Sequence, residues 1–149
     1  MKISTKVQYG LRAMAYLAQN SLDNRAVSIR EIAIREKMPA DYLEKIFAKL
    51  LKANLLAAKK GVRGGYIMSR PAAEIKVGEI FNAIENPATK VKCIDGKCAR
   101  QADCLAKNLW IKMQGAVNDF LESVTLEDLI NGKLEARSSN IRNNSQISK

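Results

Sequence analysis

The stretch that decides the fold is residues 28–70, SIREIAIREKMPADYLEKIFAKLLKANLLAAKKGVRGGYIMSR. It begins with a predicted capping box, in which the Ser28 hydroxyl and the Glu31 carboxylate each accept a hydrogen bond from an unpaired backbone N–H group. The short helix that follows is expected to end at Met38, because the residue before Pro39 disfavours helical geometry. A second amphipathic helix follows, and one polar face of it carries three lysines, Lys45, Lys49 and Lys52. Two helices joined by a tight turn, the second with a basic stripe, are typical of a helix-turn-helix.

A glycine-rich turn follows the second helix and favours this interpretation over two ordinary amphipathic helices with solvated lysines. Residues 55–60 and 66–70 flank the sequence GVRGG at 61–65, and glycine adopts the backbone conformations that a tight hairpin needs. The turn places Lys59, Lys60 and Arg63 at or near its tip. A basic hairpin directly after a reading helix predicts a wing, whose cations contact phosphates and whose Arg63 can enter a minor groove.

Helical periodicity in the rest of the chain predicts a mainly α architecture with a small β-hairpin wing. We expect helices over residues 4–20, 77–85 and about 104–124, and a short helix from 125 that ends at 131–132. The apolar stripe near 104–124 is wide enough to contact both its own domain and a second copy of the chain. The expected parts are a winged helix-turn-helix DNA-binding domain at 1–86, a cysteine loop at 87–104, dimerisation helices at 105–132 and a disordered tail at 133–149.

The formal net charge of +10 is concentrated in the first half of the chain. Residues 1–70 hold 14 Lys and Arg against 5 Asp and Glu, whereas residues 71–149 hold 11 against 10. This asymmetry indicates a polyanion-binding half, with double-stranded DNA as the partner, and a half with another task. A membrane is a weaker match, because no helix in the basic half has the Trp/Phe/Leu face of interfacial helices. With no apolar run of about 20 residues and no signal-peptide core, we expect a cytoplasmic protein.

All three cysteines fall in one polar loop, and the chain has no histidine. The odd number argues against a disulfide framework, and the missing histidine removes most catalytic schemes, so we expect neither an enzyme nor a small-molecule substrate. Flanking cations favour thiolates, which are soft ligands for iron–sulfur clusters, zinc or copper(I). The wide spacing of Cys93, Cys98 and Cys104 fits an iron–sulfur cluster better than a four-ligand zinc site. A reversible disulfide between two of the thiols is the alternative.

Several sequence blocks in one order resemble the bacterial winged-helix iron–sulfur regulators of the IscR, NsrR and RirA type. The resemblance spans about residues 1–132 and rests on MKISTKVQYGLRAM at 1–14, DYLEKIF at 41–47, GVRGGY at 61–66, VGEI at 77–80, the three cysteines and Leu109-Trp110. It implies a homodimer paired through the helix near 104–124, with two reading helices in successive major grooves of a pseudo-palindromic promoter site. It also implies that Cys93, Cys98 and Cys104 hold a cluster whose state controls DNA binding or site choice.

The lysines and Arg63 are expected to contact phosphates, whereas the start of the reading helix reaches base edges. Glu44 can accept a hydrogen bond from a cytosine amino group, and the resemblance associates its position with cluster-dependent choice between site types. The complete set of predicted DNA-binding residues is Ser28, Ala40, Asp41, Tyr42, Glu44, Lys45, Lys49, Lys52, Lys59, Lys60 and Arg63.

The fourth cluster ligand stays open. The assembly regulators have a histidine where this chain has Lys107, and the nitric-oxide sensors have an acidic residue where it has Gln8. Gln8, Asp95, Asp103, a water and a small thiol are all candidates, and both two-iron and four-iron clusters are compatible with the spacing. We expect a repressor that senses iron–sulfur status, redox state or nitric oxide, with a cluster-free thiol-redox or metal-responsive winged-helix repressor as the alternative.

Overall fold

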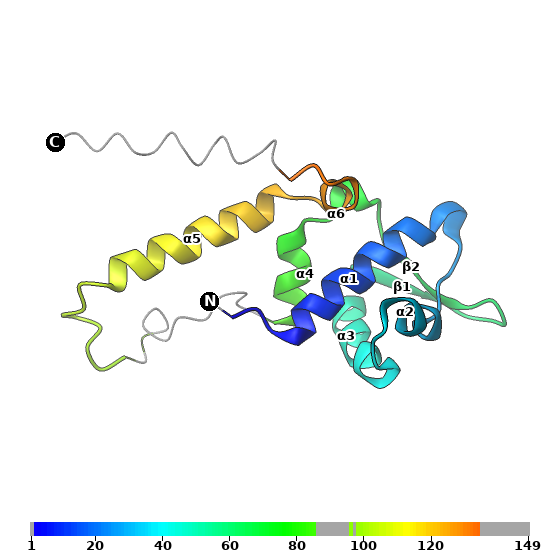
Figure 1. Ribbon diagram of the computed structural model, residues 1–149, viewed down its shortest axis with the longest axis horizontal. Coiled ribbons are helices and arrows are strands. Elements are labelled where there is room, and N and C mark those ends of the chain that lie inside the picture. The colour runs from blue at the N-terminus through cyan, green and yellow to red at the C-terminus, as the bar shows by residue number, and fades with distance from the viewer. Residues whose placement is uncertain (1, 86–95, 97, 135–149) are drawn as a thin grey trace.

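The computed structural model describes residues 2–85, 96 and 98–134. Its first part contains α1 (Thr5–Asn20), α2 (Ile29–Glu36), α3 (Ala40–Lys52) and α4 (Val77–Ile84), with short 3₁₀ turns η1 (Leu22–Asn24) and η2 (Ala72–Glu74). Strands β1 (Leu56–Lys59) and β2 (Gly65–Met68) form an antiparallel hairpin, and α5 (Lys107–Ser123) and α6 (Leu126–Asn131) complete the described chain. Figure 1 shows α1–α4, the hairpin and α6 gathered in one body, from which α5 extends as an arm. The predicted mainly α fold with a hairpin wing is confirmed.

Serine side chains cap both α1 and α2, the latter at the predicted Ser28. The hydroxyl of Ser4 accepts from the backbone N–H three residues later at 3.3 Å, and that of Ser28 does the same at 3.1 Å. The Glu31 carboxylate, predicted to complete a capping box at α2, instead accepts hydrogen bonds from Arg25 and from the Tyr16 hydroxyl. A guanidinium forms the stronger, charge-assisted bond, so this carboxylate joins α2 to the elements before it.

The turn between α2 and α3 is longer than the sequence indicated. α2 ends at Glu36, two residues before the expected boundary, because Lys37 adopts a left-handed conformation with φ of 54° and its N–H donates to the Ala33 carbonyl. Pro39 is extended and occupies the cap position of α3. Only residues 37–39 therefore separate the two helices, which is the length expected of a helix-turn-helix.

The wing is anchored to the body by a third extended segment. Leu56 pairs with Met68 across the hairpin, and Val27 pairs with Tyr66 along the other edge of β2. The Val27 N–H donates to the Tyr66 carbonyl at 2.9 Å, and the Tyr66 N–H donates to the Val27 carbonyl at 2.8 Å. This approach needs a glycine, since a Cβ on Gly65 would lie 2.6 Å from the Val27 carbonyl. The hairpin therefore has a fixed place beside the start of α2.

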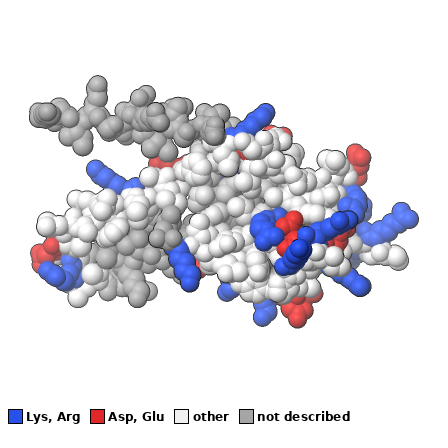
Figure 2. Space-filling model, viewed as in Figure 1, with Lys and Arg blue, Asp and Glu red and all other residues white. Residues whose placement is uncertain are grey.

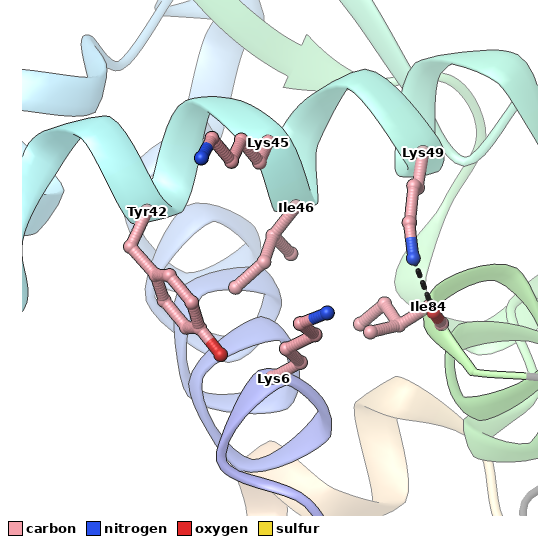
Figure 3. Close-up of a pocket in the computed structure, with 6 residues that line it drawn as sticks. All are labelled: Lys6, Tyr42, Lys45, Ile46, Lys49 and Ile84. Atoms are coloured by element: carbon pink, nitrogen blue, oxygen red, sulfur yellow. Dashed lines mark hydrogen bonds between the residues drawn. The ribbon is translucent and has the colours of Figure 1, made fainter.

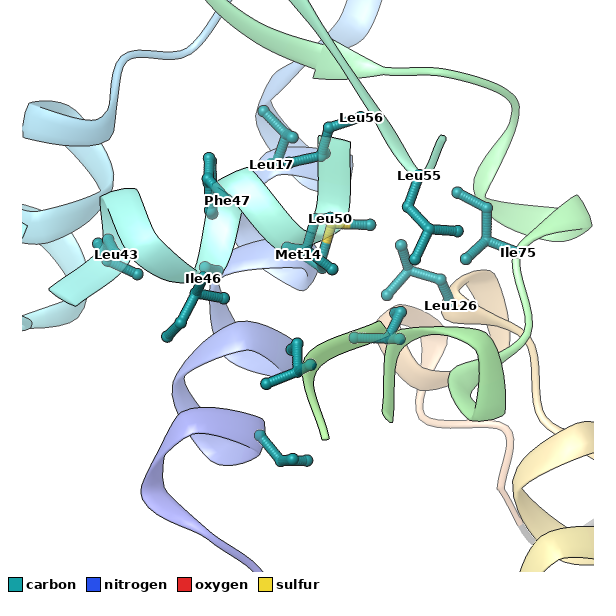
Figure 4. Packing of buried hydrophobic residues seen from close by; sticks show 14 of the residues in the cluster. Met14, Leu17, Leu43, Ile46, Phe47, Leu50, Leu55, Leu56, Ile75 and Leu126 are labelled. Carbon is teal, nitrogen blue, oxygen red and sulfur yellow. The ribbon is translucent and has the colours of Figure 1, made fainter. Parts of the chain in front are cut away.

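The core lies between α1, α3 and α4 and is closed by α6 (Figure 4). Met14 of α1, Phe47 of α3 and Ile80 of α4 are fully buried in it. Leu126 of α6 is buried with them, and its N–H donates to the Ile75 carbonyl at 2.8 Å. Apolar contact thus holds α6 on the same body as α1–α4, although α6 follows the arm in sequence. The division predicted at residue 105 stays a prediction.

α5 has an exposed apolar surface. The helix begins at Lys107, so Cys104 precedes it, and Leu121 alone among its residues is buried. The helix meets α4 at Gly78, where an added Cβ would lie 2.4 Å from the Glu122 carboxylate. Large apolar side chains remain exposed along the rest of the helix at Leu109, Ile111, Met113 and Phe120. Within the described ranges, no helix is long and apolar enough to cross a membrane.

Candidate nucleic-acid interface and cysteine segment

The outward face of α3 is exposed and carries five of the residues predicted to bind DNA, Ala40, Asp41, Glu44, Lys45 and Lys52. Tyr42 is half-buried beside this face. Its ring packs edge-to-face on Tyr9 of α1, with ring centroids 5.6 Å apart. The contact holds Tyr42 in one orientation at the start of the helix.

Lys49 is engaged differently from the other two lysines of the predicted stripe. Its Nζ donates to the Ile84 carbonyl in the last turn of α4 at 2.9 Å. The C-terminal end of a helix carries partial negative charge, which favours a cation at this place. The side chain therefore joins the reading helix to α4, a role that the stripe on α3 did not predict.

The wing and the start of α2 form one basic surface. Lys60 and Arg63 are exposed near the hairpin tip, while the Nζ of Lys59 lies 3.4 Å from the Asn24 carbonyl. Ser28, Lys59 and Arg63 line the same cleft between the wing and the loop before α2. Figure 2 shows Lys and Arg side chains gathered over the end of the molecule that carries α2 and the hairpin. The cleft thus brings together Ser28 and Arg63, two predicted residues that are far apart in the sequence.

Two ion pairs fix α2, the first helix of the helix-turn-helix. Arg12 of α1 pairs with Glu36 at 2.9 Å, and Arg25 pairs with Glu31 at 3.0 Å. Tyr16 of α1 also donates to Glu31, at 3.0 Å. Burial, and then this hydrogen bond to a carboxylate, raise the pKa of Tyr16, so its hydroxyl stays a donor at neutral pH. Both ends of α2 are thereby held against the neighbouring elements.

A basic cavity of about 150 Å³ lies between α1, α3 and the end of α4 (Figure 3). Its lining combines the apolar side chains of Ile46 and Ile84 with three lysines, Lys6, Lys45 and Lys49. Figure 3 shows the Lys6 side chain reaching from α1 into the space between Tyr42 and Ile84. Lys6 was not among the predicted site residues. Its place in the first turn of α1, where a cation opposes the helix macrodipole, is the sequence signal that singles it out.

The segment before α5 carries two of the three cysteines. Cys98 and Cys104 are half-buried free thiols, and Cys93 lies outside the described residues. Turns form the backbone between them, with the Gln101 N–H donating to the Cys98 carbonyl and the Lys107 N–H donating to the Cys104 carbonyl, both at 3.2 Å. Two free thiols on so short a segment fit the soft-donor chemistry of an iron–sulfur cluster.

Within the described part of the chain, no three metal-ligating side chains gather around these thiols. The Gln8 side-chain amide donates to the Ile3 carbonyl at 2.9 Å, at the start of α1. Asp103 is exposed beside Cys104, and Asp95 lies outside the described residues. The ligand set stays a prediction.

A short turn between two helices, an exposed reading face and a basic wing define a winged-helix DNA-binding transcriptional regulator. The chain belongs to the Rrf2 family, described as iron-dependent transcriptional regulators, whose family model matches residues 3–132. It is therefore a regulator of transcription and not an enzyme, and the resemblance inferred from the sequence blocks is confirmed.

Relatives and solved structures agree with this assignment. The chain is 36% identical to a protein of Neisseria meningitidis named as an HTH-type transcriptional regulator, over 89% of this chain and 90% of the relative. It is 31% identical to the regulator IscR of Pectobacterium atrosepticum, over 89% and 81% of the two chains. The structure of IscR from T. potens superposes with a TM-score of 0.74 at 34% identity, covering 92% of this chain and 91% of that one. CymR, described as the global cysteine regulator of B. subtilis, superposes with a TM-score of 0.76 at 32% identity, covering 89% and 98%.

Proposed function

We propose that this protein represses transcription as a homodimer, under the control of an iron–sulfur cluster held by Cys93, Cys98 and Cys104. The observation that carries the proposal is the order of parts along the structure. Free thiols precede α5, a helix with an exposed apolar face. This helix packs on α4. The end of α4 is in turn bonded to α3 through Lys49. A change at the thiols can therefore reach the reading helix through directly contacting elements.

The DNA-binding half of the proposal assigns two kinds of contact. Lys45, Lys52, Lys60 and Arg63 are exposed and would hold backbone phosphates, which makes affinity depend on salt. The start of α3 would enter a major groove, with Ala40, Asp41, Tyr42 and Glu44 closest to base edges. Bacterial promoter DNA lies in the cytoplasm, so we place the protein there.

The homodimer is supported by the apolar face of α5. Leu109 is 59% exposed and Phe120 is 37% exposed, and helical spacing puts both on one side of the helix with Met113. Contiguous exposed apolar surface on a regulator marks an interaction site. Two copies joined through α5 would present two α3 helices to successive major grooves.

When bound, an iron–sulfur cluster supplies a centre whose charge and ligation change with redox state or iron supply. The residues of this chain would connect that centre to the DNA-binding helices. Cys98 and Cys104 would fix the turns between them and thus the start of α5, and the Val77 N–H, which donates to the Val124 carbonyl at 2.9 Å, ties the end of α5 to α4. Ordering or releasing the cysteine segment would then change the spacing of the two reading helices.

A cluster-free thiol-redox regulator is the second candidate, and the comparison with CymR favours it. CymR of Staphylococcus aureus, 35% identical to this chain, has been solved in an oxidised form. Cys98 and Cys104 are free and half-buried here, so a reversible disulfide is chemically open to them. A zinc- or copper-responsive regulator would use the same soft thiols.

An anaerobic visible spectrum of the reconstituted protein, with iron and sulfide counts, separates these candidates. The control is the variant in which all three cysteines are serine, and DNA binding of both proteins is followed by fluorescence anisotropy. A visible band present in the wild type and lost in the variant, with DNA affinity that differs between cluster-loaded and cluster-free protein, supports the proposal. A colourless, iron-free wild type whose DNA affinity responds to thiol oxidation would instead establish the second candidate.

A further inference from the structure

We propose that the cavity between α1, α3 and the end of α4 binds a phosphodiester group of the DNA backbone, with Lys6 as an additional phosphate-contacting residue. The inference rests on the proposed use of α3 as the reading helix. It adds the first turn of α1 to the interface, which the predicted set of DNA-binding residues did not include.

The positive charges that line the cavity favour the binding of an anion. Lys6, Lys45 and Lys49 all line it, and none of the lining residues that the structure describes carries a carboxylate. Lys49 is partly satisfied by the Ile84 carbonyl. Lys6 and Lys45 make no ion pair with any described residue. Like charges converging over an apolar lining repel one another more strongly than in open water, and an anion between them relieves that repulsion.

The nearest acidic side chains on α3 do not provide this anion. Asp41 and Glu44 are exposed and belong to the outward face of the helix. The groups that do line the cavity from α3 are Tyr42, Lys45, Ile46 and Lys49, which follow one side of the helix toward α1 and α4. The cavity is therefore electropositive beside a reading face of mixed charge.

The position of the cavity selects the DNA backbone as the source of the phosphate. Lys45 both lines the cavity and lies next to the exposed reading face, so the cavity flanks that face along α3. A helix in a major groove has a sugar–phosphate backbone on each side. When α3 enters the groove, the backbone on the α1 side would pass over the cavity, where Lys6 reaches up between Tyr42 and Ile84 (Figure 3). Phosphate contacts of this kind set orientation and carry no sequence information.

Lys6→Gln is the test, with Lys133→Gln as the matched control. Both changes remove one exposed lysine charge, but Lys133 follows α6, on the opposite side of the body from α3 (Figure 1). Binding is measured by anisotropy over a range of sodium chloride, on a duplex selected with the wild-type protein and on a scrambled duplex. Because two copies of the chain bind one duplex, Lys6→Gln is expected to weaken binding to both duplexes by a similar factor of about five to ten for each subunit. The salt slope should fall by about one unit for each subunit. Lys6→Arg, which keeps the charge, should bind like the wild type.

Chemical removal of the phosphate charge gives a second readout. Neutral methylphosphonate groups are placed singly along the selected duplex. At one position the replacement should weaken DNA binding by the wild type but should cause no further loss of binding by Lys6→Gln. The inference is wrong if Lys6→Gln has the same salt slope as Lys133→Gln and if every methylphosphonate weakens DNA binding by the wild type and by Lys6→Gln equally. Thermal stabilisation of the wild type by millimolar inorganic phosphate, lost in Lys6→Gln while the salt slope stays unchanged, would overturn the DNA assignment in favour of a free anion. If the wild type itself shows no salt-dependent DNA binding, the proposed function fails instead.

Discussion

The Nζ of Lys49 donates a 2.9 Å hydrogen bond to the carbonyl oxygen of Ile84, which joins the reading helix to the last turn of α4. The bond lies beside the apolar core, to which Ile46 and Leu50 of α3 and Ile84 of α4 belong. Residue 86 begins the stretch that leads to Cys93. The bond therefore lies where the reading helix meets the chain leaving for the cysteines.

Lys49→Met should lower the free energy of unfolding by about 1 kcal/mol, because the Ile84 carbonyl loses its charged donor. Lys52→Met removes the same charge from the exposed end of α3 and should change stability by less than about 0.5 kcal/mol. Urea unfolding followed by circular dichroism measures both. Equal effects of the two substitutions would show that the bond does not contribute to stability.

Gly65→Ala should destabilise the protein by about 2–3 kcal/mol, since the new Cβ would meet the Val27 carbonyl at 2.6 Å and the backbone of β2 would have to move. Gly115→Ala is the control: a Cβ there meets nothing within 4 Å, and alanine favours a helix. Thermal unfolding compares the two. A Gly65→Ala protein as stable as the control would mean that the wing can move away from Val27 at little cost.

Acid should weaken the contact between Arg70 and Glu79. Burial alone would raise the pKa of Glu79, but the Lys76 backbone N–H and the Arg70 guanidinium outweigh it and hold the pKa below the ordinary value of 4.5. A depressed carboxyl pKa stabilises the fold above pH 4.5, and that contribution is lost as the pH falls through the folded-state value. Glu79→Gln should therefore be less stable than the wild type at neutral pH and should approach it in acid. A stability difference that is the same at pH 7 and in acid would exclude the linkage.

Leu109→Glu should convert the protein to a monomer, because it places a charge in the exposed apolar face of α5. Asn118→Glu adds the same charge on the opposite side of the helix and should leave a dimer. Size-exclusion chromatography with light scattering gives the mass of each. The proposed interface is incorrect if both variants, or neither, change the mass.

Glu44→Ala should relax discrimination at one base position by a factor of about 5–100, because a base-edge contact is lost. Affinity for unrelated DNA should rise slightly, since a carboxylate is repelled by phosphates. Lys52→Ala is the contrast, and should weaken all sequences alike. Anisotropy titrations on a panel of single-base operator variants test this. A Glu44→Ala protein that binds every duplex like the wild type would remove Glu44 from the base-reading set.

Local pattern alone determined most of the fold. Serine caps at Ser4 and Ser28, the proline after Met38 and the glycines at 61–65 act on residues a few positions away, so their effects can be predicted without tertiary contacts. The class of protein followed from the order of these elements. The helix boundaries that moved, at Lys37 and Lys107, depend on single backbone conformations that periodicity does not specify.

Tertiary structure decided what individual charged side chains do. Lys49 was predicted to contact phosphate from its place in a stripe, which stays a prediction, and its amino group also bonds to the Ile84 carbonyl, 35 residues away. Lys6 lines the same cavity as Lys45 because α1 packs closely on α3 and α4, where Gly10 faces the side chains of Ile46 and Ile84. The sequence by itself determined the elements and their amphipathic faces, since these are set by neighbouring residues. The partner of each long cation was decided by packing between distant segments, because a flexible side chain binds whichever acceptor the fold brings within reach.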